Sequence, residues 1–457
     1  MSSNADWRRR SLAAVWHPCT QMKLHAPEGA DVPLIPVTRA EGVWLHDAEG
    51  GRYLDAISSW WVNLFGHNHP AIRAALTDQL QRLDHVMLAG FTHAPVVELS
   101  ERLAALTGLG HAFYGSDGAS ATEIALKMSA HHWRNAGQPA KNGFVSVAGG
   151  YHGETVGALA VTDIALFREA YAPLVRLAHT VPSPDARAAT GDQTAADVAH
   201  LAADAAERWL AEHHATTAAI IVEPLVQCAS GMAMHHPVYL QRLRAACSQW
   251  QVHLVLDEIA VGFGRTGSLF AHQQAGIQPD FLCLSKGLTG GTLPLSVVLC
   301  TDVVYGAFYD DEVARGFLHS HSYTGNPLAC RAALATLDLF DETNALVANQ
   351  ASAAQLAALF EPLSAHARVR HARQQGMIFA WDVASSLPDF ARRYSRAALA
   401  RGLVLRPIGH TLYAMPPYVM NEAEMAHLAT GALAALNDTL AQEQGGDAVT
   451  QGVMDAV

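Results

Sequence analysis

The stretch from Leu254 to Gly267, LVLDEIAVGFGRTG, constrains the fold of this chain more than any other. Its apolar run, residues 252–256, has the length and composition of a buried strand, and it leads directly into Asp257. A second apolar run, residues 281–284, leads into a serine and then Lys286. Continuous apolar runs are typical of parallel strands in an α/β sheet, whose carboxyl ends share the edge where ligands bind. We therefore expect an acid and a lysine at neighbouring strand ends.

Asp257 and Lys286 together meet the two requirements of a pyridoxal 5′-phosphate site. The aldehyde of this cofactor needs an amine, and the ring nitrogen at its opposite end needs an anion. The chain has four lysines, and only Lys286 has apolar residues before it and glycines after it. Lys127 lies four residues after a glutamate on a helical pattern, which predicts a surface ion pair, whereas Lys23 and Lys141 lie in polar, loop-like sequence. The alternative for Lys286 is a solvated lysine at a strand end, but its surroundings favour a catalytic lysine.

Composition narrows the class of protein. The chain has 457 residues, of which 50% are hydrophobic and 16% charged, and this predicts a globular protein with a large core. A net charge of −12 argues against a nucleic-acid-binding surface. The six cysteines are scattered, without a C-x-x-C pair, and no signal peptide or membrane span is evident, so we expect a cytoplasmic protein. None of the 25 histidines lies in a metal-binding motif, and we predict no metal site.

The order of patterns along the chain predicts an α/β protein with two domains. A large domain, residues 71–335, would contain a mainly parallel sheet flanked by helices. Both chain ends, residues 1–70 and 336–445, would form a smaller α+β domain, and residues 446–457 would be a frayed tail. We expect residues 1–25 to form an irregular arm. The expected strands and helices include a hairpin at 37–55, helices at 70–83 and 94–106, strands at 144–147, 219–222 and 377–383, and a pair of strands within 401–418.

Three further features could serve a ligand. The small residues Gly118 and Ala119 open a helical pattern, and such a loop is either a phosphate site or a plain N-cap. Tyr151 stands between glycine-containing segments that would let the backbone approach a flat ligand. Trp60 and Trp61 either close a core or line a pocket for a partly apolar ligand.

Taken together, these features resemble the class III, fold-type I aminotransferases, and the resemblance covers nearly the whole chain. The strings that carry this resemblance most specifically are DEIAVGFGRTG, SKGLTGG, IIVEP and TGNPLAC. Further strings are similar to the members that convert 8-amino-7-oxononanoate to 7,8-diaminononanoate in biotin biosynthesis, with S-adenosylmethionine as amino donor. These are HPCTQM, AISSWWVNLFGHNHP, LDHVMLAGFTHAP, GGYHGET and LRPIGHTLYAMPPY.

The resemblance implies a role for each residue of a pyridoxal-phosphate site. Lys286 would bind the cofactor and shuttle a proton, and Asp257 would hold the positive charge at the ring nitrogen. Tyr151 would lie on one face of the ring and Ile259 on the other, with Glu223 close behind. The resemblance also assigns the phosphate to Gly118 and Ala119 of one subunit and to His321 and Ser322 of its neighbour, which implies a homodimer with shared active sites.

The resemblance further implies how the substrate binds. Arg406 would take the carboxylate of 8-amino-7-oxononanoate, which suits the planar, bidentate guanidinium. The other residues implied near the substrate are Trp60, Trp61, Ser320, Tyr413 and Cys19. Cys19 stands where familiar members have a tyrosine, Glu154 where they have an aspartate, and the Ser320-His321-Ser322 loop also differs from theirs.

Several alternatives remain open at this stage. Some relatives with a similar loop use lysine as the amino donor. Another ω-aminotransferase, acting on pyruvate or 2-oxoglutarate, would share most of these strings. An aminomutase or a decarboxylase would need no second substrate, and a cofactor-binding regulator would need a DNA-binding module that the chain does not suggest.

Overall fold

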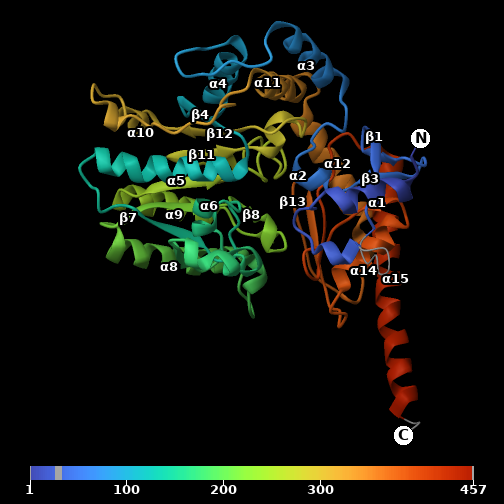
Figure 1. Ribbon diagram of the computed structural model, residues 1–457. Coiled ribbons are helices and arrows are strands. Elements are labelled where there is room, and N and C mark those ends of the chain that lie inside the picture. The colour runs from blue at the N-terminus through green and yellow to red at the C-terminus, as the bar shows by residue number, and fades with distance from the viewer. Residues whose placement is uncertain (1, 26–32, 455–457) are drawn as a thin grey trace. The chain divides into compact units, whose positions relative to one another are not determined.

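The computed structural model describes residues 2–25 and 33–454, and the chain divides into two compact units. One unit consists of residues 1–69 and 349–457, and the other of residues 70–348. The sequence suggested boundaries after residues 70 and 335. Each unit has its own sheets and helices (Figure 1).

The unit of residues 70–348 contains a seven-stranded sheet, counted over the described residues, in the order β4-β12-β11-β10-β7-β5-β6. Only β12 is antiparallel to its neighbours. The strands at the centre are buried at every position because both faces of the sheet are covered, which explains their continuous apolar sequence. The bounds are β4 His111–Gly115, β5 Gly143–Val147, β6 His179–Val181, β7 Thr217–Val222, β10 His253–Asp257, β11 Phe281–Leu284 and β12 Ser296–Cys300.

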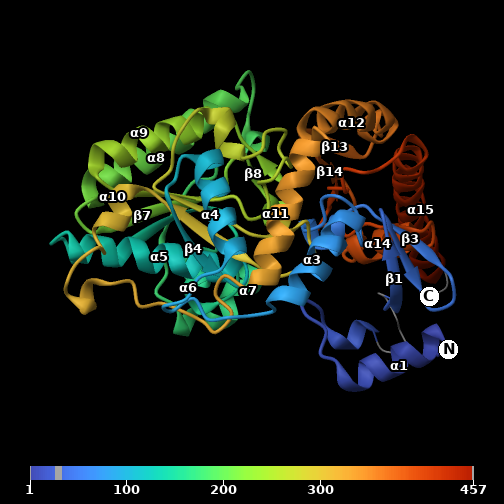
Figure 2. The ribbon, with the colours of Figure 1, turned by 90° about the horizontal axis from the view of Figure 1, so that it is seen from above.

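Helices cover both faces of this sheet. Helix α5 packs on one face, where Ile124 and Met128 join Ile221, Val255 and Val298 in a buried apolar cluster. Helices α8 and α9 lie on the other face (Figure 2). The helices of this unit are α3 Pro70–Arg82, α4 Ala94–Thr107, α5 Gly118–Asn135, α6 Val156–Val161, α7 Ala165–Arg168, α8 Ala195–His213, α9 Val238–Trp250, α10 Asp302–Gly306 and α11 Pro327–Glu342.

Two lysines of this unit differ from the sequence-based expectation. Lys127 does not pair with the glutamate one turn before it: its Nζ lies 2.7 Å from Nδ1 of His319. Lys141 lies in a loop, as expected, but it is buried, with Nζ 4.0 Å from the ring centroid of Trp133 and donating to the carbonyl oxygen of Gln251. Both lysines therefore make hydrogen-bond contacts with other residues of the same unit.

Among its described residues, the unit of residues 1–69 and 349–457 contains two small sheets. The first has the order β1-β2-β3-β15, and the turn between β2 and β3 confirms the predicted hairpin. Asp47 closes this turn by accepting hydrogen bonds from the backbone of Glu49 and Gly51. The strands of the two sheets are β1 Val37–Glu41, β2 Trp44–Asp47, β3 Arg52–Asp55 and β15 Leu403–Val404, then β13 Val369–Gln375, β14 Ile378–Val383 and β16 Thr411–Ala414.

Two expectations for this unit are wrong. The two strands within residues 401–418 do not pair with each other, because β15 joins β3 and β16 joins β14. The N-terminal arm is not irregular throughout: α1 spans Asn4–Ala14 and is capped by Ser3. The long helix α15 runs Glu422–Met454 (Figure 1), and it includes most of the tail predicted at 446–457. The two glycines of the predicted tail, Gly446 and Gly452, lower helix propensity without forbidding a helix. The last part of that tail, 455–457, lies outside the described residues.

The remaining helices of this unit are α2 Ser58–Trp61, α12 Ala345–Leu359, α13 Glu361–Ser364 and α14 Phe390–Leu399. Over the stretches that the structure describes, no helix combines the length and apolar character that crossing a membrane requires.

Candidate active site

Three charged side chains lie at the carboxyl ends of adjacent parallel strands. Asp257 ends β10, and Lys286 follows β11, which pairs with β10 in parallel register. Glu223 follows β7, the strand on the other side of β10. The predicted meeting of an acid and a lysine at neighbouring strand ends is therefore confirmed.

Asp257 is almost fully buried, and its two carboxylate oxygens have different partners. Oδ1 accepts a hydrogen bond from the backbone N–H of Ile259 at 3.0 Å. Oδ2 lies 2.7 Å from Nδ1 of His152, which therefore carries the proton of that bond. His152 is itself buried, and its Nε2 has no hydrogen-bond partner among the described residues. The carboxylate is thus fixed in orientation by a histidine that sequence reasoning did not single out.

Glu223 is a second buried carboxyl group at this edge. Its oxygens accept hydrogen bonds from the backbone N–H groups of Tyr151 at 3.0 Å and of Cys228 at 3.1 Å. Burial raises the pKa of Glu223 to about 7, and the charge of Asp257 adds to this effect. Glu223 therefore anchors the backbone that carries Tyr151.

Burial acts on Lys286 in the opposite direction. It lowers the pKa of the Lys286 amine, and the surrounding Cys228, Asp257 and Glu223 reverse part of that shift. A lowered pKa increases the fraction of neutral amine, which is the nucleophilic form that condenses with an aldehyde.

The start of α5 offers a site for an anion. Asp117 caps the helix by accepting from the N–H of Ser120 at 2.8 Å, so the N-cap reading is correct. This cap still permits anion binding. The first N–H groups of a helix, here those of Gly118 and Ala119, have no acceptor within the helix and can donate to an anion. A Cβ atom added to Gly118 would lie only 3.0 Å from Cγ2 of Ile259, so the helix start lies directly beside the segment that follows Asp257.

These observations allow a test of whether the residues suit pyridoxal 5′-phosphate. The unit supplies a buried amine, a buried carboxylate with a fixed orientation, and a helix start in contact with Ile259. Tyr151 supplies an aromatic ring whose hydroxyl donates to Glu154 at 2.9 Å. An amine, an anion for the ring nitrogen, a phosphate seat and a flat side chain are the groups that this cofactor needs, and the residues fit it.

The Ser320-His321-Ser322 loop lies in the same unit, but its described hydrogen bonds are local. The backbone N–H of His321 donates to Oγ1 of Thr324 at 3.2 Å, and that hydroxyl donates back to the His321 carbonyl at 2.8 Å. Ser320 and Ser322 are exposed.

In the other unit, the structure brings together three of the predicted substrate residues. The guanidinium carbon of Arg406 lies 4.9 Å from the ring centroid of Trp60, a cation–π contact. Nη2 of Arg406 donates to the backbone carbonyl oxygen of Cys19 at 3.1 Å. Trp61 points into the core instead, where its Nε1 donates to the hydroxyl of Tyr413 at 3.2 Å. The core alternative thus holds for Trp61, whereas Trp60 is exposed beside Arg406.

The turn that carries these tryptophans has the opposite hand to an ordinary helix. Residues Ser58, Ser59, Trp60 and Trp61 have φ values of 52°, 47°, 73° and 73°. For residues with a side chain this conformation costs roughly 1–2 kcal/mol each, so surrounding contacts must hold it. No glycine marks the turn in the sequence, and for this reason sequence reasoning missed it.

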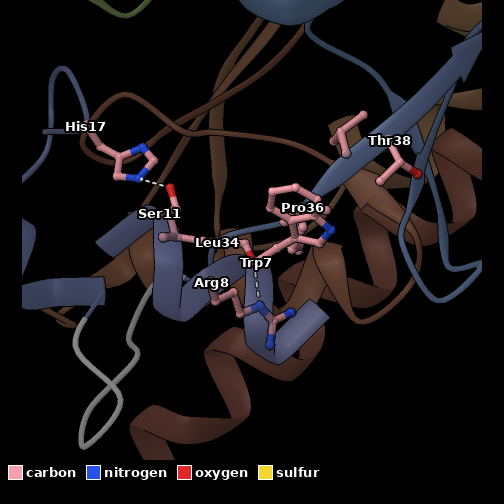
Figure 3. A pocket seen from close by; sticks show the side chains of 9 residues that line it. Trp7, Arg8, Ser11, His17, Leu34, Pro36 and Thr38 are labelled. Carbon is pink, nitrogen blue, oxygen red and sulfur yellow. Dashed lines mark hydrogen bonds between the residues drawn. The ribbon is translucent and has the colours of Figure 1, made fainter. Parts of the chain in front are cut away.

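A separate cavity of about 390 Å³ lies between α1 and the start of β1. Its lining comes from the N-terminal arm and residues 34–38, and none of the predicted site residues contributes to it (Figure 3). Ser11 and His17 are hydrogen-bonded to each other there at 2.9 Å. The cavity has no part in the arrangement around Lys286.

Comparisons with known proteins agree with the resemblance seen in the sequence. The sequence model of the family described as "Aminotransferase class-III" matches residues 25–436. The adenosylmethionine-8-amino-7-oxononanoate aminotransferase of Helicobacter pylori is 42% identical over 434 residues, which cover 93% of this chain and 97% of that protein.

Solved structures of the same kind share the fold. The crystal structure of adenosylmethionine-8-amino-7-oxononanoate aminotransferase from Methanocaldococcus jannaschii has a TM-score of 0.87 at 31% identity, covering 95% of this chain and 99% of the other. An omega transaminase from Pseudomonas jessenii, in complex with PMP, has a TM-score of 0.89 at 26% identity, covering 96% of this chain and 98% of the other. The predicted fold class is therefore confirmed, and the chain is an enzyme that belongs to the class-III aminotransferases.

Proposed function

We propose that this aminotransferase converts 8-amino-7-oxononanoate to 7,8-diaminononanoate in biotin biosynthesis, with S-adenosylmethionine as amino donor. The observation that carries the choice of substrate is Arg406 lying against Trp60: a guanidinium beside an aromatic side chain suits a carboxylate at the end of an apolar chain. The name of the Helicobacter pylori relative supports the same reaction.

The cofactor is pyridoxal 5′-phosphate, and residues 70–348 form the domain that binds it. When bound, the cofactor supplies an aldehyde that carries the amino group and a ring that accepts the electrons released when a C–H proton is removed. Lys286 would bind the aldehyde, and its amine would accept the proton from the carbon atom that bears the amino group. Asp257 stabilises the positive charge at the ring nitrogen, and His152 keeps the carboxylate in place.

Other residues position the cofactor. Gly118 and Ala119 hold the phosphate with their backbone N–H groups at the start of α5. Tyr151 and Ile259 would hold the ring between them, and Glu223 supports Tyr151 by accepting a hydrogen bond from its backbone N–H. These assignments agree with the close contact of Gly118 with Ile259.

On the substrate side, Arg406 binds the carboxylate and Trp60 contacts the apolar chain. Trp61, Tyr413, Ser320 and Cys19 complete the substrate-binding residues that the family resemblance implies. The backbone carbonyl of Cys19 accepts a hydrogen bond from Arg406, which supports placing Cys19 beside the guanidinium.

We further propose a cytoplasmic homodimer in which His321 and Ser322 of each subunit hold the cofactor phosphate of the other. Leu318 (78%) and Tyr323 (66%), on either side of this loop, are exposed, which supports a partner surface there because exposed apolar patches mark interaction sites. None of the six cysteines forms a disulfide, which agrees with a reducing compartment.

The first experiment identifies the amino donor. The absorption band of the lysine-bound cofactor is followed while S-adenosylmethionine, or separately L-lysine, is added without an acceptor. Loss of the band with S-adenosylmethionine alone supports the proposal, and a response to lysine alone replaces the donor. No response to either would refute both donors and favour another amine.

The closest second candidate is an ω-aminotransferase that uses pyruvate or 2-oxoglutarate, which the similarity to the Pseudomonas jessenii enzyme favours. Arg406→Ala separates the two proposals. We expect the Michaelis constant for 8-amino-7-oxononanoate to rise roughly 10- to 100-fold, the loss expected for a hydrogen-bonded charge. Unchanged kinetics with this substrate would favour the second candidate.

A further inference from the structure

The left-handed turn of α2, Ser58–Trp61, is held by contacts on both of its sides. Before the turn, the carbonyl of Ala56 accepts from the backbone N–H of Met415 at 2.9 Å. At its start, Oγ of Ser58 donates to the Met415 carbonyl at 2.7 Å. After it, the Leu64 carbonyl accepts from the backbone N–H of Tyr418 at 2.7 Å. The segment that follows β16 therefore fixes both ends of the turn.

Within the turn, the side chain of Ser59 has a buried partner. Its hydroxyl donates to Oδ2 of Asp55 at 2.6 Å, and Nε2 of His67 lies 2.9 Å from the same oxygen. Asp55 is 0% exposed, and its other oxygen has no partner among the described residues. Losing a donor would leave this buried carboxylate less satisfied, which costs free energy. The conformation in which the Ser59 hydroxyl donates to Asp55 is therefore strongly favoured.

The hand of the turn decides where the two tryptophans point. Trp61 is 5% exposed and bonded to Tyr413, whereas Trp60 is 42% exposed and lies against Arg406. A right-handed turn would rotate successive side chains in the opposite sense, so Trp60 could not remain on Arg406 while Trp61 stayed in the core.

We propose that Asp55, Ser59 and His67 form a positioning network that holds Trp60 against Arg406 and thereby sets the affinity for a straight-chain carboxylate. None of the three contacts the substrate; they act through the turn. The identity of the ligand rests on the proposed function, whereas the placement of Trp60 does not.

The main variant is Ser59→Ala, which removes the bond to Asp55 and leaves a residue that disfavours the left-handed conformation. Ser385→Ala is the matched control, because Ser385 also donates to a carboxylate, Oε1 of Glu443 at 2.5 Å, in the same unit. The first readout is quenching by iodide of the fluorescence of Trp60, obtained as the difference from Trp60→Phe. The second is the dissociation constant of octanoate, measured in the parent and in an Arg406→Ala background.

We expect Ser59→Ala to change the quenching of Trp60 and to weaken octanoate binding roughly tenfold, with Ser385→Ala changing neither. In the Arg406→Ala background the effect of Ser59→Ala on octanoate should disappear, since the two residues act in one chain of contacts. Unchanged quenching of Trp60 would overturn the proposal, and so would an equal effect on octanoate in both backgrounds.

A third result separates this inference from the proposed function. If Trp60 quenching changes but the parent protein does not bind octanoate, the carboxylate is the wrong ligand class and the proposed substrate fails. The positioning of Trp60 by Ser59 would then stand, and the role of the network in carboxylate affinity would be overturned.

Discussion

Replacement of His152 tests how the buried Asp257 is held. His152→Leu keeps a similar volume but removes the Nδ1–H group that lies 2.7 Å from Oδ2 of Asp257. His152→Asn is the matched variant, because the amide nitrogen of asparagine can occupy nearly the position of Nδ1 and donate in its place. The backbone N–H of Ile259 still donates to the other oxygen in both variants.

The expected loss of stability in His152→Leu is that of one hydrogen bond to a buried carboxylate. Such a bond contributes about 1.5–3 kcal/mol, and leucine leaves little cavity, so nearly all of the loss comes from the unsatisfied oxygen. For a domain of this size 1 kcal/mol corresponds to about 2–4 °C in the midpoint of thermal unfolding. We therefore expect His152→Leu to lower the midpoint by about 3–12 °C and His152→Asn to lower it by less than half as much.

The assay is thermal unfolding of the cofactor-free protein, followed by calorimetry, with the dissociation constant of pyridoxal 5′-phosphate as a second measurement. The leucine variant should bind the cofactor more weakly than the asparagine variant. Without the hydrogen bond from His152, the Asp257 carboxylate is less well oriented toward the ring nitrogen. Equal losses in the two variants would refute the reasoning, since they would show that the donated hydrogen bond is not what His152 contributes. A leucine variant as stable as the parent would refute it as well.

Three further predictions concern single residues. The folded protein raises the pKa of Glu223 from 4.5 to about 7, so it retains a proton that the unfolded chain has lost, and this residue destabilises the fold increasingly as the pH rises between those values. Glu223→Gln should therefore gain stability relative to the parent by up to about 3 kcal/mol between pH 5 and pH 8 in denaturant titrations of the cofactor-free protein; a pH-independent difference would contradict this. Lys286→Ala should abolish transamination and prevent covalent attachment of the cofactor on borohydride reduction, as mass spectrometry would show, and residual attachment would assign the lysine elsewhere. Cys19→Tyr should change the Michaelis constant of one substrate while leaving the affinity for the cofactor unaltered, and identical kinetics for both substrates would remove Cys19 from the site.

The centre of the large sheet could be predicted because its constraints are local in sequence. A strand buried on both faces has to be apolar at every position, and the runs 252–256 and 281–284 are. The charged residue that ends each run marks the edge of the sheet. Asp257 and Lys286 could be placed together from this pattern alone, before any three-dimensional information.

His152 could not be found in this way. The chain has 25 histidines, and nothing in its local pattern distinguishes a histidine that meets a buried carboxylate from one on the surface. Its contact with Asp257 joins residues 105 positions apart. The only available signal was its place directly after Tyr151 in a glycine-containing segment.

Helix α1 was missed for a different reason. Only Asn4 among its residues is buried, so it has no apolar stripe to reveal the helical period. Its formation depends on the cap at Ser3 and on contacts such as the hydrogen bond from Asn4 to the side chain of Glu49 at 2.9 Å.

The left-handed turn shows where sequence reasoning must fail at a site of this kind. Local propensity predicts a right-handed helix or a strand for Ser58–Trp61, and neither conformation would send Trp60 to Arg406 and Trp61 into the core. The energy that holds the turn comes from Asp55 and from the segment around Met415, hundreds of residues away in the second case. A conformation that is unfavourable locally persists only where surrounding contacts determine it, and such strain concentrates where a side chain has a function to perform. The unfavourable backbone of this turn therefore supports the proposal that the placement of Trp60 serves the enzyme.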